Sequence, residues 1–184
     1  MLTAALWMTS SHSKAAGLAA TEVDLVAEGA VNAAAGPVED VWVTAEFLSG
    51  NVTVATGTVG PLAAGVDGKA ANFTIRATPR TAVALWSVAR PALHAARFTV
   101  HVGGADAPAT DTHTVTFGVR ETRFDPDHGF FLNRQHVKLR GFCDFGPFGA
   151  VGAATPDRVH LFRAQVLRSV GGNAWRMVSV VPVR

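Results

Sequence analysis

Cysteine is almost absent from this chain. Cys143 is the single cysteine among 184 residues, so no disulfide can form within the chain. A fold that does not depend on oxidation fits a reducing compartment and favours the cytoplasm. Long apolar runs are missing too, since none reaches the roughly 18–20 residues that a membrane-spanning helix needs. The apolar start of the chain has no basic segment before it and soon turns polar, which predicts a strand rather than a signal peptide.

Neither sign of charge is in large excess. The formal net charge is +2, charged residues make up 16% of the chain, and the arginines form no cluster. Without a basic patch, neither a nucleic acid nor a membrane is expected as a partner. His94, His101 and His113 have no set of cysteines or acids near them, so neither a metal nor another cofactor is expected.

A repeated alternation of apolar and polar residues runs through the first two-thirds of the chain. Such alternation indicates strands that bury one face. The segments with this pattern are 21–28, 40–47, 51–58, 72–77, 97–102 and 112–119. Strands at this short spacing, separated by glycine, proline and aspartate, are typical of two sheets packed face to face. The sequence therefore predicts an immunoglobulin-like β-sandwich over residues 21–119.

The pattern changes near residue 120. Two short segments, 130–133 and 136–139, are joined by Arg134-Gln135 and predict a hairpin. A glycine-rich stretch follows from Gly141 to Gly152 and is expected to be a loop.

A helix is predicted after this loop. Thr155 can cap it, Pro156 suits its first position, and Asp157 suits the positive end of its dipole. Apolar residues at spacings of three and four then form one stripe: Val159, Phe162, Val166 and Val170. Gly171-Gly172 should end the helix, and a strand is expected over 173–178. Strand, helix and strand together suggest the opening of an α/β unit.

Several groups of residues occur in a characteristic order. They are Trp86-Ser87 with Pro91-Ala92-Leu93-His94; Phe117-Gly118-Val119-Arg120; Phe130-Phe131-Leu132-Asn133 with Val137-Lys138-Leu139-Arg140-Gly141; Pro156-Asp157-Arg158; and Gly172-Asn173-Ala174-Trp175-Arg176. Together they resemble signatures of glycoside hydrolase family 2, the family of β-galactosidase, over about residues 21–178. His94 stands where tyrosine is usual in that family, and Arg134 stands where a turn glycine is usual.

The resemblance implies a mainly β chain, with an immunoglobulin-like β-sandwich followed by the truncated beginning of a (β/α)8 barrel. The implied domains are a remnant of a preceding sugar-binding β-sandwich over 1–20, the immunoglobulin-like sandwich over 21–119, and the incomplete N-terminal part of a catalytic TIM barrel over 120–184. Large apolar residues of the signatures are expected to anchor the core: Trp86, Leu93, Phe117 and Val119.

The same resemblance implies hydrolysis of terminal β-galactosides, or of related β-glycosides, by a retaining mechanism. Retaining glycosidases use two carboxylates about 5–5.5 Å apart, and in this family both are glutamates on later barrel strands. A complete barrel needs about 250 residues, and no glutamate follows Glu121 in this chain. No residue here is therefore predicted to be catalytic. The chain alone is expected to be inactive, and a β-glycoside carbohydrate is the expected partner of its parent enzyme.

Two residues are predicted to contact substrate. Asp144 stands where the family has an asparagine. Arg176 matches a family arginine at the carboxyl end of a barrel strand, where binding residues gather. Phe145 and Phe148 replace family histidines and cannot hydrogen-bond a sugar hydroxyl. The family pattern is lost after Arg176, which suggests a frameshift or a pseudogene.

Other classes of function stay open at this point. The chain could be a non-catalytic module, either a spacer sandwich or an interaction protein. An unrelated immunoglobulin-like binding protein is a third possibility, but it leaves the ordered signatures unexplained. The residues do not predict the oligomeric state.

Overall fold

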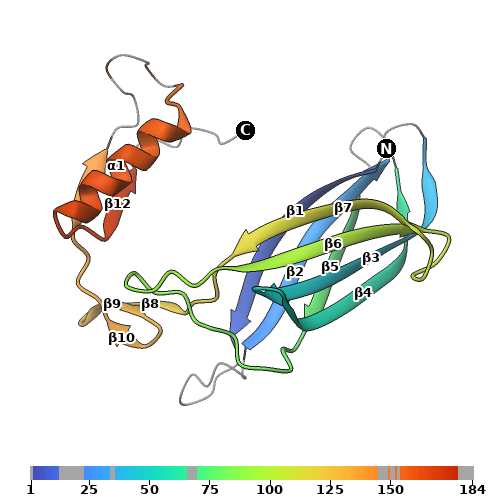
Figure 1. Ribbon diagram of the computed structural model, residues 1–184, viewed down its shortest axis with the longest axis horizontal. Helices are drawn as coiled ribbons and strands as arrows, with labels where there is room; N and C mark the ends of the chain where they lie inside the picture. The colour runs from blue at the N-terminus through green and yellow to red at the C-terminus, as the bar shows by residue number, and fades with distance from the viewer. Residues whose placement is uncertain are drawn as a thin grey trace. The chain divides into compact units, whose positions relative to one another are not determined.

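In the computed structural model the chain is mainly β, and its described residues include one helix (Figure 1). The structure describes residues 2–12, 23–33, 36–65, 70–144, 149, 152 and 154–177. It divides into two compact units, Met1–Glu121 and Thr122–Arg184. Each unit has its own sheets.

The first unit is built from two antiparallel sheets. One holds β1 (Leu2–His12), β2 (Val23–Ala33) and β5 (Ala71–Ala77), in the order β1-β2-β5. The other holds β3 (Val38–Ser49), β4 (Val52–Ala64), β6 (His94–Val102) and β7 (Ala109–Phe117), in the order β4-β3-β6-β7. Each of the six segments predicted from alternation overlaps one of the strands β2 to β7. The predicted β-sandwich is confirmed.

The core lies between the two sheets and is formed by the inward face of each strand. On β3 every second residue is fully buried, from Val41 through Val43 and Ala45 to Phe47. Rings from the two sheets meet there, because the centroids of Phe73 on β5 and Phe98 on β6 are 6.4 Å apart. Burying a large apolar side chain stabilises a fold by about 1.5–3 kcal/mol, so this continuous layer is the main source of the unit's stability.

The first strand of the chain is paired with this sandwich. β1 runs antiparallel to β2 in unbroken register, from Leu2 opposite Ala33 to His12 opposite Val23. β1 therefore joins the sheet that also holds β5. The assignment of residues 1–20 to a preceding sugar-binding sandwich stays a prediction, and this pairing does not favour it.

One predicted core anchor is wrong. Leu93 is 60% exposed, whereas its neighbour His94 is buried at 4%. The reason is that β6 begins at His94, so alternation turns His94, Ala96 and Phe98 inward and leaves Leu93 outside the strand. The His94 Nε2–H donates to the Ala84 carbonyl at 2.8 Å.

The other three predicted anchors do pack on the sandwich. Val119 is buried, Phe117 packs against the core, and Trp86 is partly buried. The Trp86 ring lies against Gly118, where a Cβ would come within 3.0–3.1 Å of the indole. The Arg120 guanidinium covers the ring at 4.8 Å from its centroid. Two of the sequence signatures thus meet at one indole.

The second unit begins with a three-stranded antiparallel sheet. It holds β8 (Thr122–Asp125), β9 (Gly129–Leu132) and β10 (Gln135–His136), in the order β10-β9-β8. The turn between β9 and β10 places Asn133 at φ 50° and Arg134 at φ 64°. Two positive φ values in succession are typical of a type I′ hairpin turn, so the predicted hairpin is present although arginine occupies a position that favours glycine.

Asp125 organises the turn between β8 and β9. Its carboxylate accepts hydrogen bonds from the His128 ring at 2.9 Å, from the His128 backbone N–H at 3.0 Å and from Arg123 at 2.6 Å. These donors, the His128 ring first, lower the pKa of Asp125 from 3.8 to about 2.

This carboxylate predicts an acid-dependent loss of the turn. A depressed folded pKa gives stability that is present above the unfolded value of 3.8 and is lost as the pH falls toward 2. We expect a carbon-detected NMR titration to place the Asp125 midpoint near 2. His128→Ala removes the strongest donor and should move that midpoint upward. A midpoint at the ordinary value in the unaltered chain would contradict the hydrogen-bonded turn.

The unit ends in a strand, a helix and a parallel strand: β11 (Gly141–Asp144), α1 (Asp157–Ser169) and β12 (Ala174–Met177). The predicted loop over 141–152 is therefore wrong at its start, where β11 pairs with β12. Of the rest of that stretch, Phe145 and Phe148 lie outside the described residues. Among the described helices none is long and apolar enough to cross a membrane.

The two ends of α1 differ in how well they follow the prediction. Pro156 is the N-cap, and the Thr155 hydroxyl donates to the Gly152 carbonyl, so the expected Thr155 cap is wrong. At the other end, Gly172 N–H donates to the Leu167 carbonyl and Gly171 N–H to the Arg168 carbonyl. This pair of bonds is a Schellman motif, and the predicted glycine stop is confirmed.

Candidate functional site

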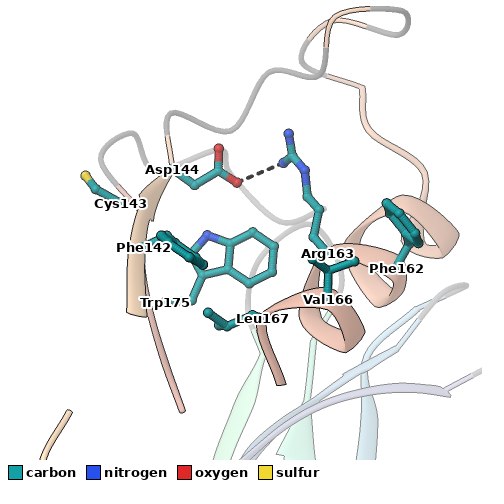
Figure 2. A pocket seen from close by; sticks show the side chains of 8 residues that line it. All are labelled: Phe142, Cys143, Asp144, Phe162, Arg163, Val166, Leu167 and Trp175. Carbon is teal, nitrogen blue, oxygen red and sulfur yellow. Dashed lines mark hydrogen bonds and ion pairs between the residues drawn. The ribbon is translucent and has the colours of Figure 1, made fainter. Parts of the chain in front are cut away.

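The register of β11 and β12 decides which way their side chains point. Cys143 pairs with Arg176, and Phe142 pairs with Trp175. Because side chains alternate along a strand, Cys143 and Arg176 share one face of the pair. Phe142, Asp144 and Trp175 share the other face, the one that carries α1, and Figure 2 shows Cys143 pointing away from the helix.

Asp144 is engaged with the helix. Its carboxylate accepts from Arg163 Nη1 at 2.8 Å, and both side chains are about four-fifths covered. Figure 2 shows the two side chains reaching toward each other from the strand and from the helix. Since this partly buried pair ties β11 to α1, it has a structural role that the sequence did not reveal.

Arg176 lies on the opposite face and is exposed. Its Nη1 is 3.5 Å from the Cys143 sulfur, which is the partner that the register gives it. The guanidinium is held at the end of β12 with donors available to a solute, which suits contact with a sugar hydroxyl or a carboxylate. The two predicted substrate residues, Asp144 and Arg176, are therefore not brought together, and their contact with substrate stays a prediction.

Asn173 fastens the start of this strand pair. Its Oδ1 accepts from the Arg140 backbone N–H at 2.8 Å, and its Nδ2 donates to the Lys138 carbonyl at 3.1 Å. Gly141 meets Ala174 so closely that a Cβ would collide with the Ala174 carbonyl. These residues belong to the sequence signatures, and the structure gives the physical reason: they set the distance and register of two parallel strands.

The helix covers only part of the strand pair. A cavity of about 250 Å³ remains between them, lined by Phe142, Cys143, Asp144, Phe162, Arg163, Val166, Leu167 and Trp175 (Figure 2). The predicted stripe of α1 is largely uncovered, because Phe162 is 59% and Val170 67% exposed. Val159 of that stripe is half-buried, as are Arg163 and Leu167. No residue of α1 is fully buried.

Three of the four acids of the second unit have structural positions. Asp125 and Asp144 are each bonded to an arginine, and Asp157 opens the helix. Within the described ranges, no group of three or more His, Cys, Asp or Glu residues could hold a metal ion.

The sequence of this chain is similar to segments of known glycosidases. The chain is 36% identical over 72 residues to a β-glucuronidase of Bacteroides fragilis, which is 39% of this chain and 10% of that protein. It is 36% identical over 87 residues to a β-galactosidase of Thermoanaerobacterium thermosulfurigenes, which is 47% of this chain and 12% of that protein. The chain thus spans about a tenth of the length of these curated relatives. No protein-family model matches it.

Solved structures share the fold over nearly the whole chain. A β-glucuronidase of Bacteroides uniformis covers 97% of this chain with a TM-score of 0.76 and 23% identity, and the match takes up 20% of that protein. A family 2 glycosyl hydrolase of Bacteroides cellulosilyticus covers 95% with a TM-score of 0.71 and 22% identity, and the match takes up 23% of that protein. At this identity the structural matches establish the fold.

The curated relatives are glycosidases, and the solved structures that share the fold include a family 2 glycosyl hydrolase. The relatives bear out the resemblance that the sequence signatures carry. Together they support a relationship to glycoside hydrolase family 2, and this chain matches one segment of these larger proteins.

Proposed function

We propose that this chain supplies the spacer sandwich and the first strand–helix–strand unit of a retaining β-glycosidase. The domains would be an immunoglobulin-like sandwich over 21–119 and the opening of a (β/α)8 barrel over 120–184. The parent enzyme would hydrolyse terminal β-galactosides or a related β-glycoside. This chain would have no activity by itself.

The face on which Arg176 lies is the observation that carries the proposal. In a (β/α)8 barrel the helices form the outer ring, and the strand side chains on the other face point into the barrel. Here α1 covers one face of the β11–β12 pair, while Arg176 lies on the other face at the end of β12. In a complete barrel, Arg176 would reach substrate from this position.

The lack of two suitable carboxylates supports the proposal that this chain is inactive by itself. Retention requires an acid/base carboxylate and a nucleophilic carboxylate about 5–5.5 Å apart. The chain has no glutamate after Glu121, and Asp144 is paired with Arg163 on the helix side. A sugar held by Arg176 would therefore meet neither of the two groups.

An activity assay tests this claim. We expect the purified chain to release no chromophore above the blank from a chromogenic β-galactoside or β-glucuronide. A full-length relative such as the Bacteroides uniformis enzyme serves as the positive control. A mock purification measures any glycosidase of the expression host. Turnover by the pure chain above that background would overturn the proposed inactivity.

Reading the gene beyond the codon for Arg184 tests the parent enzyme. A frame that continues with barrel strands and two glutamates at strand ends supports the glycosidase. Stop codons in every frame would favour the second candidate, a non-catalytic module. That candidate is favoured by one observation, namely that the sandwich has a complete buried core whereas α1 buries no residue fully.

A further inference from the structure

The outer face of the four-stranded sheet carries a flat set of polar side chains and one tryptophan. A row of threonines crosses all four strands in register: Thr58, Thr44, Thr99 and Thr112. Trp42 precedes Thr44 by two residues on β3 and so lies on the same face, between the buried Val41 and Val43. All of these residues belong to the first unit, Met1–Glu121.

Trp42 lies flat on the sheet. A Cβ built on Gly60 would sit 2.5 Å from Trp42 Cδ2 and 2.8 Å from its Cε3 and Cγ. Cδ2 is one of the two atoms shared by the indole rings, and its neighbours Cε3 and Cγ are almost as close, so the approach is from the ring face. One face of the indole therefore covers Gly60, and the opposite face is turned away from the sheet. The side chain is only partly buried.

The indole is fixed in this orientation by Asp40. Trp42 Nε1–H donates to Asp40 Oδ1 at 2.8 Å. Asp40 holds a left-handed backbone conformation, with φ 54°, at an irregularity in the β3–β4 register. Non-glycine residues in this conformation are uncommon and cluster at functional sites, where the surrounding structure holds them in place.

Other hydrogen-bonding groups occupy neighbouring positions on the same face of the sheet. His101 pairs with Trp42 across β3 and β6, and its Nδ1–H donates to the Ala107 carbonyl at 2.6 Å. The neutral ring then has Nε2 as an acceptor. The Thr44 hydroxyl is 3.1 Å from that of Thr58 and has a neighbour across the next strand in Thr99. An aromatic plane thus stands beside an imidazole acceptor, a carboxylate and hydroxyls.

We propose that this face of the first unit is a carbohydrate-binding site, with Trp42 as its platform. The apolar C–H face of a pyranose ring stacks on the open indole face, while its hydroxyls bond to Asp40, His101 and Thr44. An aromatic face with a few fixed polar groups is the usual makeup of a small-molecule site. A pyranose combines an apolar C–H face with a ring of hydroxyls, so a neutral oligosaccharide matches an indole that is flanked by hydroxyls and other fixed polar groups.

The first test is NMR on the full ¹⁵N-labelled chain. The chain has four tryptophans, and the indole N–H signal of Trp42 is identified by its loss in Trp42→Phe. Cellotetraose, lactose and methyl β-glucuronide are titrated separately. We expect a saturable shift of the Trp42 signal, larger than the shifts of the other indoles. A shift only with the charged glucuronide would overturn the preference for a neutral sugar. Absence of any saturable shift would overturn the site itself.

Matched variants separate binding from folding. Trp42→Ala should weaken oligosaccharide binding about tenfold or more, because the stacking surface is lost. Trp42→Phe should retain part of it, and His101→Ala should weaken binding while leaving the indole in place. Leu48→Ala, further along the same outer face of β3, is the control and should bind as the unaltered chain does. Thermal unfolding of each variant shows that it is folded.

Equal affinity in Trp42→Ala and Leu48→Ala would overturn the proposal, since the sugar would then lie elsewhere. A lower melting temperature in Trp42→Ala, together with no sugar binding by the unaltered chain, would also overturn it. The indole would in that case only cover Gly60. A failure of the glycosidase proposal leaves this test unaffected, because the site lies on the sandwich and needs no turnover.

Discussion

Replacing Phe47 by alanine should lower the free energy of unfolding of the sandwich by about 3–5 kcal/mol. Phe47 is fully buried on β3, and its ring meets that of Phe117 edge-on with centroids 6.3 Å apart. Truncation removes apolar contacts and leaves a cavity that the surrounding strands can only partly fill. Urea denaturation followed by tryptophan fluorescence measures the loss.

Two further variants make this result interpretable. Since whole domains are stable by only about 5–15 kcal/mol, Phe47→Ala could unfold much of the sample. Phe47→Leu keeps most of the apolar volume and should lose less. Thr56→Ala, on the exposed face of β4, should change stability by less than about 0.5 kcal/mol. An unchanged midpoint for Phe47→Ala with an unchanged slope would contradict the placement of Phe47 in the core.

Limited trypsin digestion should remove the second unit long before it cuts the sandwich. The sandwich buries a continuous core, whereas α1 buries no residue fully and Phe162 and Val170 are more than half exposed. Regions with few buried contacts open at low free-energy cost. If opening one segment costs about 2.7 kcal/mol less than opening another, trypsin cuts the first about a hundredfold faster, provided that each segment closes faster than it is cut.

Arginines in both units give the digestion an internal control. Arg76 and Arg97 lie on sandwich strands, while Arg158 and Arg168 lie on α1, so trypsin has cleavage sites in both units. Mass spectrometry should find early cuts after Arg158 and Arg168 and late cuts after Arg76 and Arg97. Similar rates at all four sites would show that the second unit is as well protected as the first and would sink this prediction.

The sandwich was predictable because a strand that buries one face has apolar residues at alternate positions of its sequence. On β3 the residues Val41, Val43 and Phe47 recur at every second or fourth position, and the structure buries all three. The limits of a strand are set more weakly. Leu93 was expected inside, but the strand begins one residue later and turns His94 inward instead.

The candidate site was less predictable because it depends on pairing between distant residues. Asp144 was matched to a binding position by its place in a motif, yet the register of β11 points it at Arg163 on the helix. Nothing local to either residue indicates that contact. Likewise, the stripe on α1 correctly marks an apolar surface, but which part is covered depends on what packs against it. The end of the helix was predictable, because Gly171 and Gly172 act locally.

The antiparallel pairing of β2 with β5 sets an order of assembly during synthesis. Leu25 pairs with Ala77, and the Thr78 hydroxyl bonds to Asp24, so the first sheet cannot close until the ribosome has passed residue 78. The second sheet must wait for β7 to reach Phe117. Such long-range pairings make folding slow, of the order of milliseconds to seconds. Nevertheless, every strand of both sheets is translated before β11, so the sandwich leaves the ribosome and can begin to fold ahead of the segment that bears Arg176.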